Sequence, residues 1–143
     1  MRGAVLVAAA AVLVVVPVQT AGGAGLPFRA SPSHVNFGSF PINSGFTDEM
    51  STTFTNTSKT TIQTGTLFHF SGDAAHFAPD PNDSGIDDHT TCDDGDFLAP
   101  GETCTLSMKF GPGATGHLSM TVYVLDGTNT NEIGKVVFSG HGA

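Results

Sequence analysis

Two cysteines, a run of aspartates and six histidines are the residues of this chain whose types could support chemistry. Cys92 and Cys104 are the only thiols among the 143 residues. Paired thiols bind a metal ion, exchange electrons or close a disulfide. The spacing here is not Cys-x-x-Cys and no histidine cluster accompanies it, so the metal and redox alternatives lack support. We predict a disulfide, which persists if the chain is exported to an oxidising compartment.

The region from Asp80 to Asp96 holds seven of the thirteen acidic residues. Part of it has the oxygen-ligand spacing of a calcium loop, in which a glycine makes the sharp turn. The candidate ligands are Asp80, Asn82, Ser84 and Asp88. However, Thr91 stands at the twelfth position, where such a loop has a bidentate glutamate, and Pro81 interrupts the run. We predict a solvated acidic loop over residues 80–96, with calcium binding as the alternative.

The histidines are spaced too widely to encode a local metal site. No two of them have the i, i+2 spacing of a strand or the i, i+4 spacing of a helix; they are His34, His69, His76, His89, His117 and His141. The chain has no Gly-x-Ser-x-Gly elbow, and adjacent carboxylates such as Asp93 and Asp94 are commonplace on loops. We therefore predict no enzyme, no catalytic residue, no cofactor and no metal centre.

The first 24 residues have the features of a secretory signal peptide. Arg2 supplies a positive charge, residues 4–16 form an uninterrupted apolar run, and Pro17 ends it. A transmembrane helix needs about 20 apolar residues, so the run is short for an uncleaved anchor, which stays as the alternative. We predict a signal peptide over residues 1–24, a secreted or cell-surface location, and no membrane span after cleavage.

The charge balance of the remaining chain excludes one class of partner. Without Arg2, four basic residues stand against thirteen acidic ones. Nucleic acids and anionic membranes are bound through lysine and arginine contacts to phosphate. We therefore predict that the chain does not bind nucleic acid.

Short β-strands are the elements that must position the cysteines and the acidic loop. The clearest one follows the Pro100-Gly101 turn, where apolar and polar residues alternate from Cys104 to Phe110. The other expected strands cover residues 34–40, 49–57, 61–70, 117–125 and 133–139. Gly65 interrupts the third of these and suggests a bulge or a switch between sheets. One helical turn over residues 74–77 is expected to present Phe77 to the core.

This pattern predicts an all-β chain, an immunoglobulin-like antiparallel β-sandwich of about seven strands. Its inward positions are expected to include Met50, Thr52 and Phe54 on one strand and Phe68 and Phe70 on the next. We expect the domain over residues 31–143. Residues 25–30, which include Gly25 and Pro27, are expected to form a flexible lead-in.

Several short motifs occur in a familiar order between Ala30 and the C-terminus. They are Ser33 to Gly38, Phe54 to Thr57, Phe77, Cys92, Leu98 to Cys104, Phe110 to Pro112, Gly116 and Ser139 to Gly142. Taken together, they resemble the ASPM/SPD-2/hydin (ASH) group of immunoglobulin-like domains and the related bacterial choice-of-anchor D modules. The resemblance implies a β-sandwich used for protein contacts or as a spacer, without catalytic residues. Many such relatives occur as tandem copies, whereas this chain has one module, so its protein partner stays undefined.

The expected role is therefore that of a secreted structural or protein-interaction module, with an unknown protein partner at or outside the cell surface. The alternative, from a different class, is a protein that binds calcium or a small ligand through the acidic loop 80–96.

Export can be tested directly. Because the small residues of a signal-peptidase site follow Pro17, we expect N-terminal sequencing of secreted protein to begin between Ala21 and Leu26. Recovery of the full-length chain in the membrane fraction alone would contradict cleavage.

Overall fold

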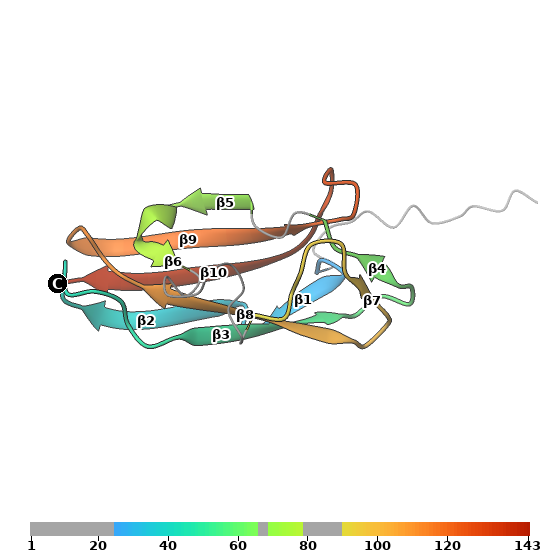
Figure 1. Cartoon of the computed structure of the whole chain (residues 1–143), viewed down its shortest axis with the longest axis horizontal. Helices are drawn as coiled ribbons and strands as arrows, with labels where there is room; N and C mark the ends of the chain where they lie inside the picture. The colour runs from blue at the N-terminus through green and yellow to red at the C-terminus, as the bar shows by residue number, and fades with distance from the viewer. Residues whose placement is uncertain (1–24, 66–68, 79–89) are drawn as a thin grey trace, which may run out of the picture.

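The computed structural model describes residues 25–65, 69–78 and 90–143. They form two four-stranded β-sheets that pack face to face, and a two-stranded sheet at one end (Figure 1). The predicted signal peptide, residues 1–24, and most of the acidic loop, residues 79–89, lie outside the described residues. Within the described part of the chain, no helix is long and apolar enough to cross a membrane. The prediction of an all-β immunoglobulin-like sandwich is confirmed.

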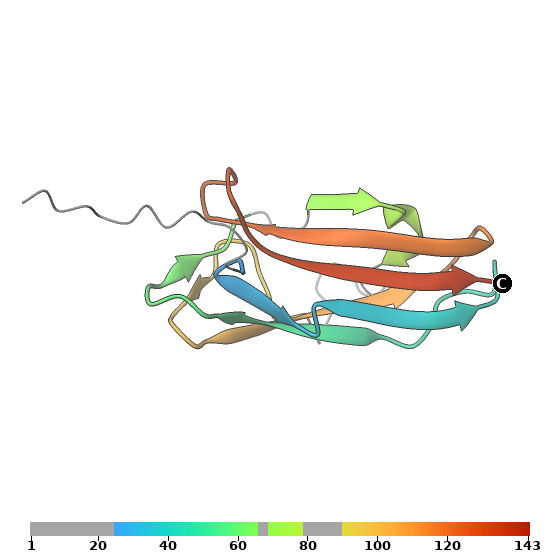
Figure 2. The ribbon, with the colours of Figure 1, turned by 180° about the vertical axis from the view of Figure 1, so that it is seen from behind.

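Ten strands make up the described sheets. Sheet A has the order β1 (Phe28–Ser31), β3 (Met50–Asn56), β8 (Thr103–Phe110), β6 (Phe77–Ala78). Sheet B has the order β2 (His34–Phe40), β10 (Glu132–Gly142), β9 (Gly116–Leu125), β5 (His69–Gly72). The third sheet pairs β4 (Ile62–Gln63) with β7 (Phe97–Leu98). Figure 2 shows β2, β10 and β9 running side by side, and of the pairings between these strands only β2 with β10 is parallel.

The expectation of a flexible lead-in over residues 25–30 is wrong for its second half. β1 begins at Phe28, which is 1% exposed and stacks on Phe54 with 4.9 Å between ring centroids. β1 pairs with β3, and the chain then crosses to sheet B, where β2 pairs with β10. The hydroxyl of Thr52 donates to the carbonyl of Pro32 at this crossing, over 2.6 Å. The neighbouring glycine and proline favour a loop, but burial of the Phe28 ring holds this segment in a strand.

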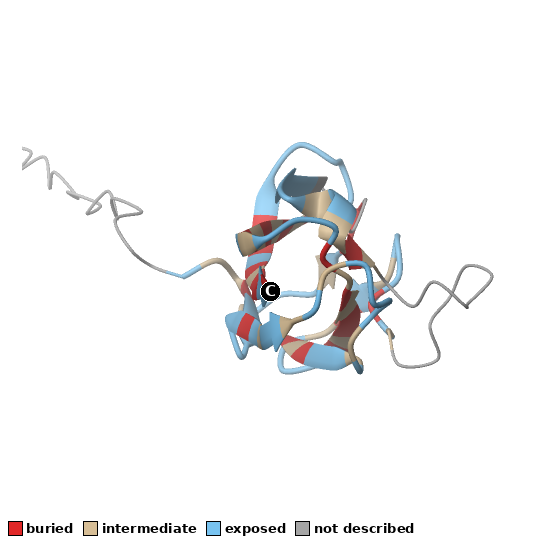
Figure 3. Cartoon of the chain, turned by 90° about the vertical axis from the view of Figure 1, so that its left-hand side faces the viewer, coloured by how far each residue is buried: buried red, intermediate tan, exposed pale blue. Residues whose placement is uncertain are grey.

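The alternating residues of β8 and β9 form the core between the two sheets. The buried residues include every second residue along both strands: Cys104, Leu106, Met108, Phe110, Leu118, Met120, Val122 and Val124. In the end-on view of Figure 3, buried segments line the space that the two sheets enclose. The predicted helical turn is present as a 3-10 turn over Ala74–His76, and it delivers Phe77 to this core.

The strand predicted over residues 61–70 is divided between two sheets. Its first part is β4, which pairs with β7, and its last part enters β5, which pairs with β9 in sheet B. Gly65 stands at the switch, where a Cβ would overlap the carbonyl of Asp126. Two residues that the sequence predicts to face the core, Met50 and Phe70, are instead 41% and 40% exposed. Met50 is the first residue of its strand, and Phe70 lies on an edge strand, so neither is fully covered. Phe68 lies outside the described residues.

β2 is an edge strand with an irregular backbone. Gly38 has a φ of 72°, and its amide donates to the side-chain oxygen of Asn36 over 2.9 Å. The ladder between β2 and β10 shifts register between Ser139 and His141. Gly38 therefore bends the strand.

Phe110 is the centre of the aromatic part of the core. Its ring centroid lies 5.0 Å from that of Phe77 and 5.7 Å from that of Phe37, which comes from the opposite sheet. On β10, Gly140 approaches the same ring, and a Cβ on Gly140 would lie 2.7 Å from Cζ of Phe110. Two carbons do not approach so closely, so the packing of the two sheets requires glycine at this position.

We expect Gly140→Ala to lower the free energy of unfolding by roughly 1–3 kcal/mol, as overpacking of a core does. The matched control is Gly113→Ala, since a Cβ on Gly113 would have 3.4 Å to its nearest neighbour, in His76. Urea denaturation compares the two variants. Equal stability of both would contradict the tight contact at Gly140.

Candidate functional site

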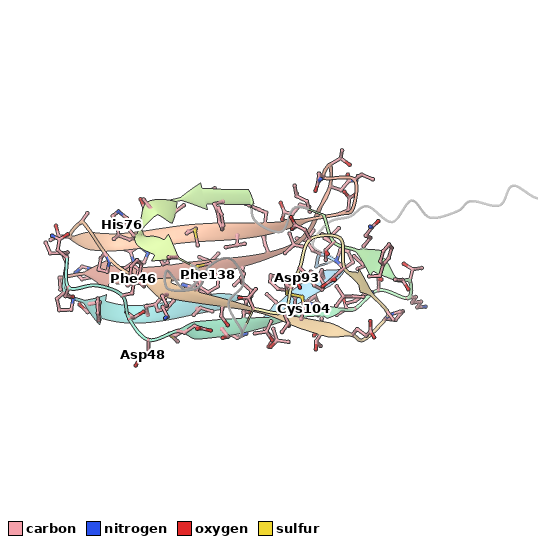
Figure 4. All side chains as sticks on the ribbon, in the orientation of Figure 1. Phe46, Asp48, His76, Asp93, Cys104 and Phe138 are labelled. Atoms are coloured by element: carbon pink, nitrogen blue, oxygen red, sulfur yellow. A yellow bond between two sulfur atoms is a disulfide. The ribbon has the colours of Figure 1, made fainter. Side chains whose placement is uncertain are left out.

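The two cysteines form a buried disulfide. Cys92 and Cys104 are bonded with their Cα atoms 4.9 Å apart, and neither side chain is exposed (Figure 4). Cys104 lies opposite Phe54 in the pairing of β3 with β8. Since both thiols are used in the bond, the structure offers neither sulfur as a metal ligand or nucleophile. The bond therefore acts structurally, by tying the end of the acidic loop to a core strand.

Hydrogen bonds hold the same segment against β8. The amides of Thr91 and Cys92 both donate to the carbonyl of Thr105, at 2.8 and 3.2 Å. In return, the amide of Thr105 donates to the hydroxyl of Thr91, and the amide of Ser107 donates to that of Thr90. Threonine hydroxyls thus supply acceptors that a strand partner would otherwise provide.

Asn56 is a buried polar residue whose role the sequence does not show. Its side-chain nitrogen donates to the carbonyls of Leu98 and Thr60, at 2.8 and 2.9 Å, and its side-chain oxygen accepts from Ser58. Its backbone carbonyl also accepts from Gly101, in the turn that follows Pro100. A buried amide with every bond made is costly to disturb. Asn56 begins a glycosylation sequon, but the whole residue is 0% exposed. Its side-chain nitrogen, where a glycan would be attached, is held by protein acceptors.

The candidate calcium ligands Asp80, Asn82, Ser84 and Asp88 lie outside the described residues. The described end of the acidic loop is a turn anchored by buried Thr64, which donates to the carbonyls of Asp93 and Asp96. No group of three or more histidines, cysteines or acids that could hold a metal occurs within residues 25–65, 69–78 and 90–143.

Asp126 organises the hairpin that joins β9 to β10. Its carboxylate accepts from the side chains of Asn131 and Thr128 and from the amide of Thr130. These bonds, that of the Asn131 side chain above all, hold the pKa of the Asp126 carboxyl well below its ordinary value. Because the folded-state pKa is lowered, the bonds support the folded state at neutral pH and are lost only in strong acid.

The structure separates the histidines into different environments. His34 Nε2 lies 2.7 Å from the hydroxyl oxygen of Ser139, and His76 Nδ1 accepts from the amide of Gly113. His117 and His141 are exposed and stand opposite each other in the pairing of β9 with β10. Their separation of 24 positions hides this pair from any local spacing rule. The pair can be recognised only from the register of the hairpin, by pairing β9 with β10 from the connecting turn to the far end of the strands. His89 lies outside the described residues.

No protein-family model and no curated protein sequence matches this chain. Solved structures with a similar fold do exist. The ASH/PapD-like domain of human CEP192 (PapD-like domain 7) is 14% identical, with a TM-score of 0.50, and the match covers 95% of this chain and 97% of that one. The secreted serine protease VesC from Vibrio cholerae is 16% identical, with a TM-score of 0.51, and the match covers 82% of this chain.

The two matches differ in how much of the other protein they include. This chain spans 23% of the VesC chain, whereas it spans nearly all of the CEP192 domain. At such low identity the likeness shows the fold alone. The chain therefore has an immunoglobulin-like fold similar to that of the CEP192 domain.

We expect the double variant Cys92→Ala, Cys104→Ala to keep the fold and to lose roughly 2–4 kcal/mol in the free energy of unfolding, since the loop is no longer closed in the unfolded chain. Thermal denaturation of oxidised wild type, reduced wild type and the variant measures the loss. Alkylation of unreduced native protein, followed by intact-mass analysis, should label neither thiol. A labelled thiol, or a variant that melts with oxidised wild type, would contradict the structural role of the bond.

Proposed function

We propose that this chain is an exported, non-catalytic module that works by contact with another protein at or outside the cell surface. Three observations support the proposal: the immunoglobulin-like fold, the disulfide and the signal-like pattern of residues 1–24. The proposed domain organisation is a cleaved segment over residues 1–24 and one sandwich domain, which starts at Phe28 rather than at residue 31. The likeness to choice-of-anchor D modules is part of the same proposal.

The exposure of Phe97 is the observation that carries the interaction role. Its side chain is 69% exposed, more than any other large apolar side chain in the described residues. The neighbouring Leu98 is buried, and its carbonyl accepts from Asn56, so the backbone beside Phe97 is fixed. Aromatic side chains on a rigid backbone are common anchors of protein interfaces, because burial of the ring is favourable and little conformational entropy is lost.

A non-catalytic role is supported by what the described residues bring together. The disulfide uses both thiols, and the described acids Asp93 and Asp94 lie exposed on a turn. The protease activity of VesC is a property of that protein, of which this chain matches less than a quarter. The CEP192 domain, which this chain matches along its length, is an ASH/PapD-like domain.

Phe97→Ser is the variant that tests the proposal. Tagged mature wild-type protein is used to capture its partner from native culture medium. The variant should fail to capture that partner or bind it at least about tenfold more weakly, as expected when an interface hot spot is removed. Phe46→Ser is the matched control, because Phe46 is also exposed but packs over Gly111 at another site. Thermal denaturation should show that Phe97→Ser keeps the wild-type fold.

Equal capture by wild type and Phe97→Ser would overturn the proposed anchor. Calorimetric titration with Ca²⁺ distinguishes the alternative function. Heat of binding in wild type that disappears when Asp80, Asn82 and Asp88 are replaced by alanine would favour the cation-binding role instead.

A further inference from the structure

β9 and β10 place two imidazole side chains together at one end of sheet B. His117 and His141 are Cα partners in this antiparallel ladder, next to the pair formed by Leu118 and Gly140. Residues directly opposite in such a ladder point to the same face, with Cβ atoms about 4.5–5.5 Å apart. Since Leu118 points into the core, His117 and His141 point to the outer face, and both are exposed. The paired ends of β9 and β10 lie beside the end marked C in Figure 2.

The surroundings of the pair leave room and carry little positive charge. Its neighbours on the outer face are small: the next pair on that face is Ser119 with Ser139, and Ser39 of β2 lies opposite His141 on the other side. β2, β5 and β9 contain no lysine or arginine. The lysine of β10 is Lys135, six residues from His141, which is about 20 Å along an extended strand. The chain as a whole has a net charge of −8, which favours the approach of a cation.

We propose that His117 and His141 form a surface site for a divalent late transition-metal ion. Imidazole nitrogen is a preferred ligand of Cu²⁺, Ni²⁺ and Zn²⁺, and among these ions Cu²⁺ binds most tightly to a given set of nitrogen ligands. The two side chains supply two ligands, and water completes the coordination sphere. The ion bridges β9 and β10 in the folded state, so it stabilises that state by an amount that grows with the logarithm of its concentration above the dissociation constant.

His34 and His76 are less suited to the same ion than the facing pair. His34 and His76 each direct a ring nitrogen to a protein group, the hydroxyl of Ser139 and the amide of Gly113 respectively. Coordination through that nitrogen would break an existing hydrogen bond. His34 also reaches the outer face of β10 at Ser139, two residues from His141, which makes it the sharpest control for the assignment.

The test is a titration of the full mature chain with CuCl₂ in a buffer that does not bind copper. Wild type should bind one Cu²⁺ in its tightest class, with nitrogen hyperfine structure in the electron paramagnetic resonance spectrum, and its Tm should rise with copper concentration. His117→Asn and His141→Asn should each weaken that binding at least about tenfold and abolish the rise in Tm, because each removes one of two ligands. His34→Asn should retain both signals.

A second measurement needs no variant. Substoichiometric Cu²⁺ should broaden the amide resonances of Gly116, Leu118 and Gly142 in wild type before those of Arg29 and Asn56, which are in sheet A. Copper binding that persists at full strength in either single variant of the pair, or that is lost in His34→Asn, would overturn the two-residue site. Broadening that begins elsewhere would overturn it equally.

Discussion

The packing of Phe110 between the two sheets is the constraint on which the rest of the structure depends. Its ring meets Phe77 in its own sheet and Phe37 in the other, and glycine at position 140 lets β10 come close. Its backbone is held as firmly, because Thr47 accepts from its amide and donates to its carbonyl. The next residue, Gly111, donates to the carbonyl of His76. One residue thus joins both sheets and two connecting segments, and its placement sets the spacing of the sandwich.

The sequence predicts well those elements whose stability comes from alternation along a single strand. The buried apolar residues of β8 and β9 follow from periodicity, since every second side chain must enter the core. β1 is hidden from this reasoning, because one buried ring, Phe28, decides its position against glycine and proline neighbours. The division of residues 61–70 between two sheets follows from the close approach of Gly65 to Asp126, which is a contact distant in sequence.

Polar sites are harder to predict than the core for the same reason. The disulfide is accessible to prediction, since a chain with two cysteines has one way to pair them within itself. The structural role of Asn56 could not be predicted, because its hydrogen-bond partners Leu98 and Gly101 come from a turn more than 40 positions away. The facing pair of His117 and His141 depends on the register of a whole hairpin. A fold of this type therefore defines a scaffold, while its function depends on side chains that the scaffold brings together.

The bend of β2 at Gly38 has a consequence for how the molecule behaves among copies of itself. A straight edge strand offers a row of unpaired amides and carbonyls, on which a strand of another molecule can add and begin a fibril. At Gly38 the amide turns instead to the side chain of Asn36, and the backbone leaves the extended conformation. An incoming strand would lose a hydrogen bond and meet a kink at that point. The irregularity thus makes the β2 edge of sheet B a poor template for an added strand.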